Sequence, residues 1–222
     1  MTRPGLPRYL LAAYVLLIVY ASLHPLGGWS AQGAAPFAYL VAPWPRWITG
    51  FDLAANVFAY VPYGLLVVWV GAPAFGARRA CVAGIASAAL LSSLLEAAQG
   101  YVPTRVASNV DLLANAAGAA LGVLLALRIE PALRFTPWLA RLRVALCPGS
   151  ETDLGLTLLT LWVFAQLNPA SLLFGTGDLR DLLSGAGGPA YGAELFVAVE
   201  TATAAANLLA VSLLASALMM PG

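Results

Sequence analysis

The chain has 222 residues, of which 61% are hydrophobic and only 9% are charged, with a formal net charge of +1 at pH 7. Soluble domains carry roughly 25% charged residues, so this composition excludes an ordinary soluble domain and indicates a polytopic membrane protein. All eleven basic residues are arginines and they form no basic run, so we expect no nucleic-acid partner.

Six apolar stretches have the length that a membrane-spanning helix needs, which is about 17–25 residues. In chain order they are Tyr9–Leu26, Phe51–Gly71, Ala80–Gly100, Asn109–Leu127, Asp153–Phe174 and Ala193–Met219. The sequence therefore predicts an all-α fold, a polytopic transmembrane helical bundle of about six spans.

Arginines are distributed unevenly between the two sides that these spans define. One side holds Arg3, Arg8, Arg78, Arg79, Arg128, Arg134, Arg141 and Arg143, and the other holds Arg46, Arg105 and Arg180. Because cytoplasmic loops carry the excess of basic residues, the N-terminus is predicted to be cytoplasmic. Cys81 and Cys147 then face the cytoplasm, where disulfides are rare, and their spacing does not fit a metal site.

Two connecting segments have compositions of their own. Residues 27–50, predicted to be extracytoplasmic, contain three tryptophans, which favour the lipid headgroup layer. This segment is either an interfacial loop or a re-entrant flap over a site. Residues 129–150 place apolar side chains from Phe135 to Leu146 at helical spacing among arginines. They predict a cytoplasmic amphipathic connector on the inner leaflet, or a plain surface connector.

The predicted domains are a four-helix transmembrane unit over residues 8–128, the connector, and an additional helix pair over residues 151–222. A short echo relates Ser22–Pro25 to Gln166–Pro169, since a polar helix end with proline closes spans 1 and 5. Internal repeats are common in membrane folds. If the echo marks a repeat, we expect the natural chain to continue past Gly222.

Polar residues gather around the short predicted loop between spans 3 and 4. Glu96 and Gln99 lie three residues apart near the outer end of span 3, and Asp111 and Asn115 lie four apart at the start of span 4. Each pair shares one helix face. Arg105 lies in the loop, so we expect all five side chains in one outer-leaflet zone.

Span 2 adds to the same layer. Asp52 and Asn56 lie four residues apart at its outer end, and His24 ends span 1 nearby. Gly118 and Gly122 follow Asn115 as a G-x-x-x-G motif, which lets helices approach closely. The sequence thus predicts a polar pocket formed by spans 1 to 4.

Charge in apolar surroundings is costly, which favours a functional interpretation. Arginine grips phosphate or carboxylate in a bidentate manner, and a carboxylate such as Glu96 or Asp111 suits proton transfer. The structural alternatives are an Arg105 bridge between Glu96 and Asp111 that locks the hairpin, and an Asp52 that only complements a helix dipole. We find no metal-ligand set and identify no cofactor.

These residues resemble the VanZ-like family of bacterial membrane proteins. Its pattern includes S-L-x-P after the first span, an Asp followed by P-x-G in the second, and E-x-x-Q, P-x-R and D-x-x-x-N-x-x-G-x-x-x-G. Here the last three blocks are Glu96 and Gln99, Pro103 and Arg105, and Asp111, Asn115, Gly118 and Gly122. Many members carry Lys and His early in the second span, where this chain has Leu53 and Asn56.

The resemblance implies a multi-pass protein of the bacterial cell membrane with an envelope role, in a family linked to teicoplanin resistance. We expect the ligand-binding residues to be Asp52, Asn56, Glu96, Gln99, Arg105, Asp111 and Asn115, and the partner to be a membrane lipid or a lipid-linked envelope precursor. The alternatives are a lipid enzyme with Glu96 or Asp111 as base, a transporter, and a structural or partner-binding protein. The oligomeric state stays open.

Overall fold

A computed structural model of the chain describes residues 5–24, 28–30, 35–45, 47–103, 105–134, 145–147, 149–166 and 193–219. These residues form α-helices joined by loops, and among them the only β-type pairing is an isolated bridge between Leu146 and Met219. The chain divides into two compact units, Met1–Pro137 and Trp138–Gly222. Each unit is described below by itself.

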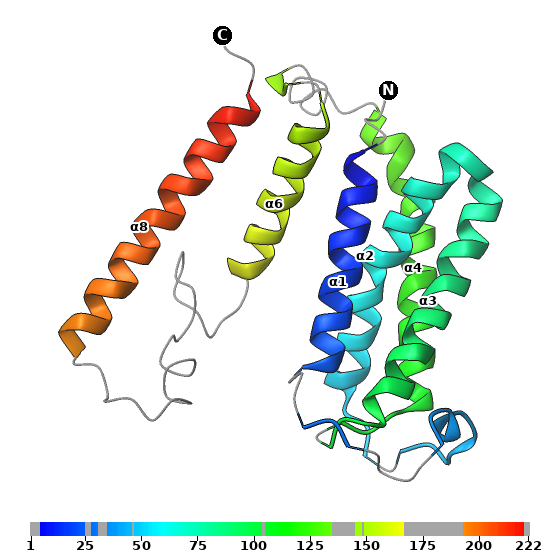
Figure 1. The fold of residues 1–222 in the computed structure, drawn as a ribbon. Coiled ribbons are helices and arrows are strands. Elements are labelled where there is room, and N and C mark those ends of the chain that lie inside the picture. The colour runs from blue at the N-terminus through cyan, green and yellow to red at the C-terminus, as the bar shows by residue number, and fades with distance from the viewer. Residues whose placement is uncertain are drawn as a thin grey trace. The chain divides into compact units, whose positions relative to one another are not determined.

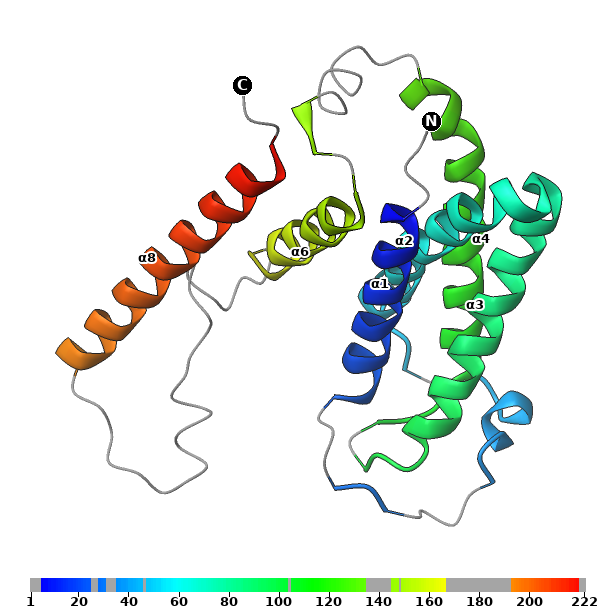
Figure 2. The ribbon, with the colours of Figure 1, turned by 45° about the horizontal axis from the view of Figure 1, so that its top comes forward.

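The first unit is a bundle of four helices (Figure 1). They are α1 (Leu6–Leu23), α2 (Gly50–Phe75), α3 (Ala77–Gln99) and α4 (Asn109–Arg134), and the 3-10 helix η1 (Ala38–Val41) lies in the connection from α1 to α2. The α3–α4 loop and η1 lie at the same end of the bundle in both ribbon views (Figures 1 and 2). We call this the hairpin end; α1 and α3 finish there, and α2 and α4 begin there.

Five helices are long and apolar enough to cross a membrane within the part of the chain that the structure describes. They are Leu6–Leu23, Gly50–Phe75, Ala77–Gln99, Asn109–Ile129 and Val197–Leu218, which confirms five of the six predicted spans. The remaining prediction, Asp153–Phe174, overlaps α6 (Ser150–Gln166), whose 17 residues are confirmed as helix. Its residues 167–174 lie outside the described residues, so its crossing stays a prediction. The chain is a multi-pass, all-α membrane protein.

Glycines allow α2 and α4 to pack with their backbones in contact. A Cβ atom added at Gly118 would overlap the carbonyl oxygen of Val57, and one added at Gly122 would overlap that of Val61. On the facing helix, a Cβ atom at Gly64 would overlap the carbonyl oxygen of Ala119. The G-x-x-x-G motif is therefore the site of closest approach, and the α2–α4 contact is the most extensive in the bundle.

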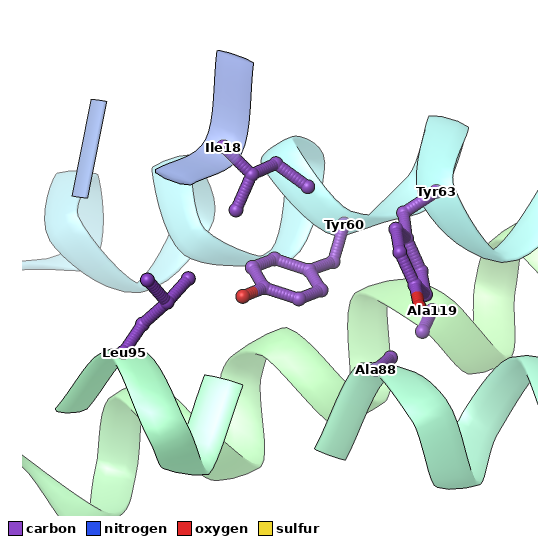
Figure 3. Close-up of a cluster of buried hydrophobic side chains, with 6 residues drawn as sticks. All are labelled: Ile18, Tyr60, Tyr63, Ala88, Leu95 and Ala119. Atoms are coloured by element: carbon purple, nitrogen blue, oxygen red, sulfur yellow. The ribbon is translucent and has the colours of Figure 1, made fainter. Parts of the chain in front are cut away.

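A small apolar core joins α1 to the other three helices. Tyr60 of α2 lies between Ile18 of α1 and Leu95 of α3, and Tyr63 lies one turn further along α2 (Figure 3). Ile18 is the buried residue of α1, and five partly buried side chains of this helix pack against the same cluster: Leu11, Tyr14, Val15, Val19 and Leu23. Polar contacts at the hairpin end add to this packing.

The second unit contains α6 and α8 (Ala193–Leu218), which contact each other. Gly155 of α6 lies against the side chain of Leu218, and the backbone N–H of Cys147 donates to the Leu218 carbonyl at 2.9 Å. Of the predicted connector, residues 129–134 continue α4. Residues 135–144, which carry most of the predicted amphipathic helix, and residues 167–169 of the sequence echo lie outside the described residues.

Candidate functional site at the hairpin end

The two acidic residues that start α2 and α4 occupy equivalent capping positions. Thr49 accepts from the backbone N–H of Asp52 at 3.0 Å and donates its hydroxyl to the Asp52 carboxylate at 2.6 Å. The Ser108 hydroxyl accepts from the N–H of Asp111 at 3.3 Å. Both carboxylates thus sit in the first turn of a helix, where the macrodipole favours negative charge.

Glu96 of α3 is bound to the start of α4 although its side chain is only 4% exposed. Its carboxylate accepts from the backbone N–H of Ser108 at 2.8 Å. In a capping box, the acid of the first helical turn accepts that N–H. Here Glu96 takes that role. The Asp111 carboxylate instead interacts with the Asn56 side chain of α2 and is repelled by the nearby carboxylate of Asp52.

Arg105 and Gln99 bind the carbonyl oxygens at the end of α1. The Arg105 guanidinium donates to the His24 carbonyl at 3.1 Å and to the Ala21 carbonyl at 3.2 Å. The Gln99 amide donates to the Ser22 carbonyl at 2.9 Å. These oxygens lack partners inside the helix, so both side chains act as a C-terminal cap for α1, and the arginine also complements its dipole.

The described residues contain no ion pair between Arg105 and Glu96 or Asp111, so the structural alternative of a locking bridge does not occur among them. Arg105 uses Nε and one terminal nitrogen, Nη2, for the end of α1. No hydrogen bond of its other terminal nitrogen, Nη1, is present among these residues. A guanidinium has five N–H donors in a fixed fork, so the two N–H groups of Nη1 remain available for a further acceptor.

That arginine lines a cavity between the α3–α4 hairpin and the segment that precedes α2. The cavity has a volume of about 260 Å³. Its lining residues are Ala35, Pro36, Ala38, Tyr39, Ala97, Gly100, Tyr101, Arg105, Val106 and Ala107. Arg105 is the only charged side chain in this lining.

Residues 35–45 form one wall of the cavity and are fixed to the helices by specific bonds. Tyr39, which is buried, donates its hydroxyl to the carbonyl of Ser93 on α3 at 3.0 Å. The Asn109 amide of α4 donates to the Ala42 carbonyl at 2.8 Å. The segment thus covers the hairpin end, as expected for the flap interpretation. Trp44 and Trp47 are exposed, as expected for the interfacial one.

A second polar layer lies deeper in the bundle. Asn115 of α4 donates to the Ser92 hydroxyl of α3 at 2.9 Å, with both side chains buried. Tyr63 donates to Ser87 at 3.0 Å. Beyond this layer, Val68, Val123 and Ala126 form an apolar cluster. The polar contacts therefore end within the bundle.

The seven predicted site residues all lie at the hairpin end or deeper in the bundle, but they separate into groups. Arg105 lines the cavity, and Gln99 binds α1 beside it. Glu96 and Asn115 are buried between α3 and α4, while Asp52, Asn56 and Asp111 meet between α2 and α4. Within the described ranges, no group of three His, Cys, Asp or Glu residues could hold a metal ion.

Sequence reasoning missed three residues that organise this region, Ser92, Ser108 and Tyr39. Ser92 precedes Glu96 by four residues and so shares its helix face, and Ser108 forms the S-x-x-D capping pattern with Asp111. Both signals were present in the sequence. Tyr39 carries no such pattern, because its contact with α3 joins residues 54 apart.

Comparisons with known proteins place this arrangement in a family. The VanZ/LLP1 family pattern matches residues 9–130, which is more than half of the chain and covers the four helices that build the hairpin end. No curated protein and no solved structure matches the chain. By the extent of its match, the chain belongs to the VanZ/LLP1 family.

Proposed function

We propose that this VanZ-like protein binds an anionic lipid-linked or headgroup ligand at Arg105, in the outer leaflet of the bacterial cell membrane. The observation that carries the proposal is an exposed arginine that forms no ion pair among the described residues and lines a cavity. Its Nε and Nη2 donate to carbonyl oxygens at the end of α1, which leaves the two N–H groups of Nη1 for a ligand. The outer-leaflet placement rests on the arginine bias of the sequence.

The chemistry of the cavity supports an anion of modest size. Hydrogen bonds from a guanidinium to phosphate or carboxylate are charge-assisted and about twice as strong as neutral ones. Pockets for drug-sized ligands span about 300–1,000 Å³. A cavity of about 260 Å³ suits a headgroup better than a whole antibiotic. A lipid-linked envelope precursor would connect such binding to the glycopeptide resistance or envelope biogenesis that the family resemblance implies.

The other candidate functions have less support. A lipid enzyme would need Glu96 or Asp111 as a base, but neither is among the residues that line the cavity. A transporter would need a polar route across the bundle, and the apolar cluster of Val68, Val123 and Ala126 lies in its way. A purely structural role explains the capping contacts of Arg105 but does not explain the cavity beside it.

The experiment measures thermal stabilisation of the purified protein by a polyprenyl phosphate and by phosphatidylglycerol. A ligand at 100 times its Kd stabilises the folded state by about 2.7 kcal/mol. We expect this stabilisation in the unmodified protein and in Arg105→Lys at higher ligand concentration, and we expect its loss in Arg105→Gln, which keeps a hydrogen-bond donor without the charge. Arg78→Gln is the matched control, because Arg78 is an exposed arginine at the opposite end of α3. Equal stabilisation of Arg105→Gln and the control would overturn the proposal.

A further inference from the structure

One face of α3 extends from the cavity along the apolar outer surface of the bundle. Leu90, Leu94 and Ala97 lie at positions i, i+4 and i+7, which share a helix face. Ala97 is 7% exposed and lines the cavity, whereas Leu94 is 52% and Leu90 is 61% exposed. These three residues form what we call the α3 stripe, which extends for about 10 Å along the helix.

The cavity itself is poor in polar partners for a small soluble anion. Besides Arg105, only Tyr39 and Tyr101 bring polar side chains to its lining, and the Tyr39 hydroxyl is already bonded to Ser93. Val106, next to the arginine, is 84% exposed. A single cation surrounded by small apolar residues matches an amphiphile better than a fully hydrated anion, because the apolar surface gains from contact with hydrocarbon.

We infer that the ligand is a chain-bearing anionic lipid that enters sideways from the bilayer, with its phosphate on Arg105 and its hydrocarbon chains along the α3 stripe. The inference rests on the proposed function and narrows its ligand class. Three observations support it: the cation lies at the hairpin end, Ala97 lines the cavity beside it, and Leu94 and Leu90 continue the same helix face away from that end. Single exposed leucines on a spanning helix face lipid anyway. The continuity of this stripe with the only charged cavity residue distinguishes it.

The test compares the same anion with and without chains. Binding of phosphatidylglycerol, glycerol phosphate and inorganic phosphate is measured on the full chain in detergent by thermal shift, with native mass spectrometry for the lipid. The stripe variant is Leu90→Ala with Leu94→Ala. The matched control is Leu113→Ala with Leu124→Ala, which truncates two comparably exposed leucines of α4. Arg105→Gln is measured alongside.

We expect phosphatidylglycerol to bind at least about tenfold more tightly than glycerol phosphate. The stripe variant should lower the affinity for phosphatidylglycerol by about tenfold, whereas the control pair should leave it unchanged. Arg105-dependent binding with equal affinity for lipid and glycerol phosphate would overturn the inference and leave the proposed function standing. Equal weakening by the control pair would also overturn the inference. Binding that ignores Arg105→Gln for every probe would overturn both.

Discussion

Gly118 and Gly122 offer a direct test of how the first unit is held together. Alanine at either position would place its Cβ atom on a carbonyl oxygen of α2, at Val57 or Val61. Because these oxygens belong to the helix backbone, they cannot rotate away as a side chain would. The substitution must therefore push α2 and α4 apart along their whole contact.

The expected magnitude combines two opposing effects. Alanine in a helix interior is more favourable than glycine by about 1 kcal/mol. Overpacking typically costs about 1–3 kcal/mol, and we place this overlap at the upper end because the obstacle is backbone. The net expectation for Gly118→Ala or Gly122→Ala is a loss of about 2 kcal/mol of unfolding free energy.

The assay is reversible unfolding in mixed detergent, followed by circular dichroism. Gly50→Ala is the control, since a Cβ atom at Gly50 meets nothing within 4 Å. We expect Gly50→Ala to leave stability unchanged or slightly raised. Gly118→Ala and Gly122→Ala variants as stable as Gly50→Ala would refute the close packing of α2 on α4.

Three further predictions concern the hairpin end. Glu96→Leu should lower the free energy of unfolding by about 1–3 kcal/mol, because it leaves the buried N–H of Ser108 without its acceptor. Glu96→Gln should retain most of the stability in the same unfolding assay, and equal losses in the two variants would contradict this bond. Tyr39→Phe removes the bond to Ser93, so it should lower the free energy of unfolding by about 1 kcal/mol and speed hydrogen exchange in residues 35–45. Unchanged exchange would show that other contacts hold this segment. Gln99→Ala should increase hydrogen exchange at the end of α1 while leaving the end of α3 protected, and equal loss at both helices would argue against a capping role.

The spans were predictable because each is a single long apolar run, and the requirement for about 20 such residues is a property of the bilayer rather than of the fold. A close helix contact at Gly118 and Gly122 was also predictable, since G-x-x-x-G leaves a groove on one helix face. The residues that fill this groove were not predictable, because they contribute the backbone carbonyl oxygens of Val57 and Val61, and backbone atoms give no sequence signal.

The polar residues were predictable as a group but not in their pairings. One arginine among three acids suggests ion pairs when only the sequence is considered. In the structure these charges pair with helix ends: Asp52 and Asp111 lie at helix starts, and Arg105 at the end of α1. Which helix ends meet depends on the tertiary arrangement, so a linear pattern could not assign it.

The cavity depends on contacts of still longer range. Its wall at residues 35–45 is held by Tyr39 and Asn109, which bind partners 54 and 67 residues away in the chain. Composition alone is compatible with both interpretations of the segment before α2. Neither tryptophan nor proline content specifies where such a segment docks.

The most direct test of anion binding at Arg105 is an experimental structure of the protein in lipid nanodiscs that contain phosphatidylglycerol. We predict a phosphate oxygen about 2.7–3.2 Å from Nη1 of Arg105, with the bonds from Arg105 to the Ala21 and His24 carbonyls retained. Arg105 closed in an ion pair with Glu96 or Asp111, with no phosphate density in the cavity, would contradict it.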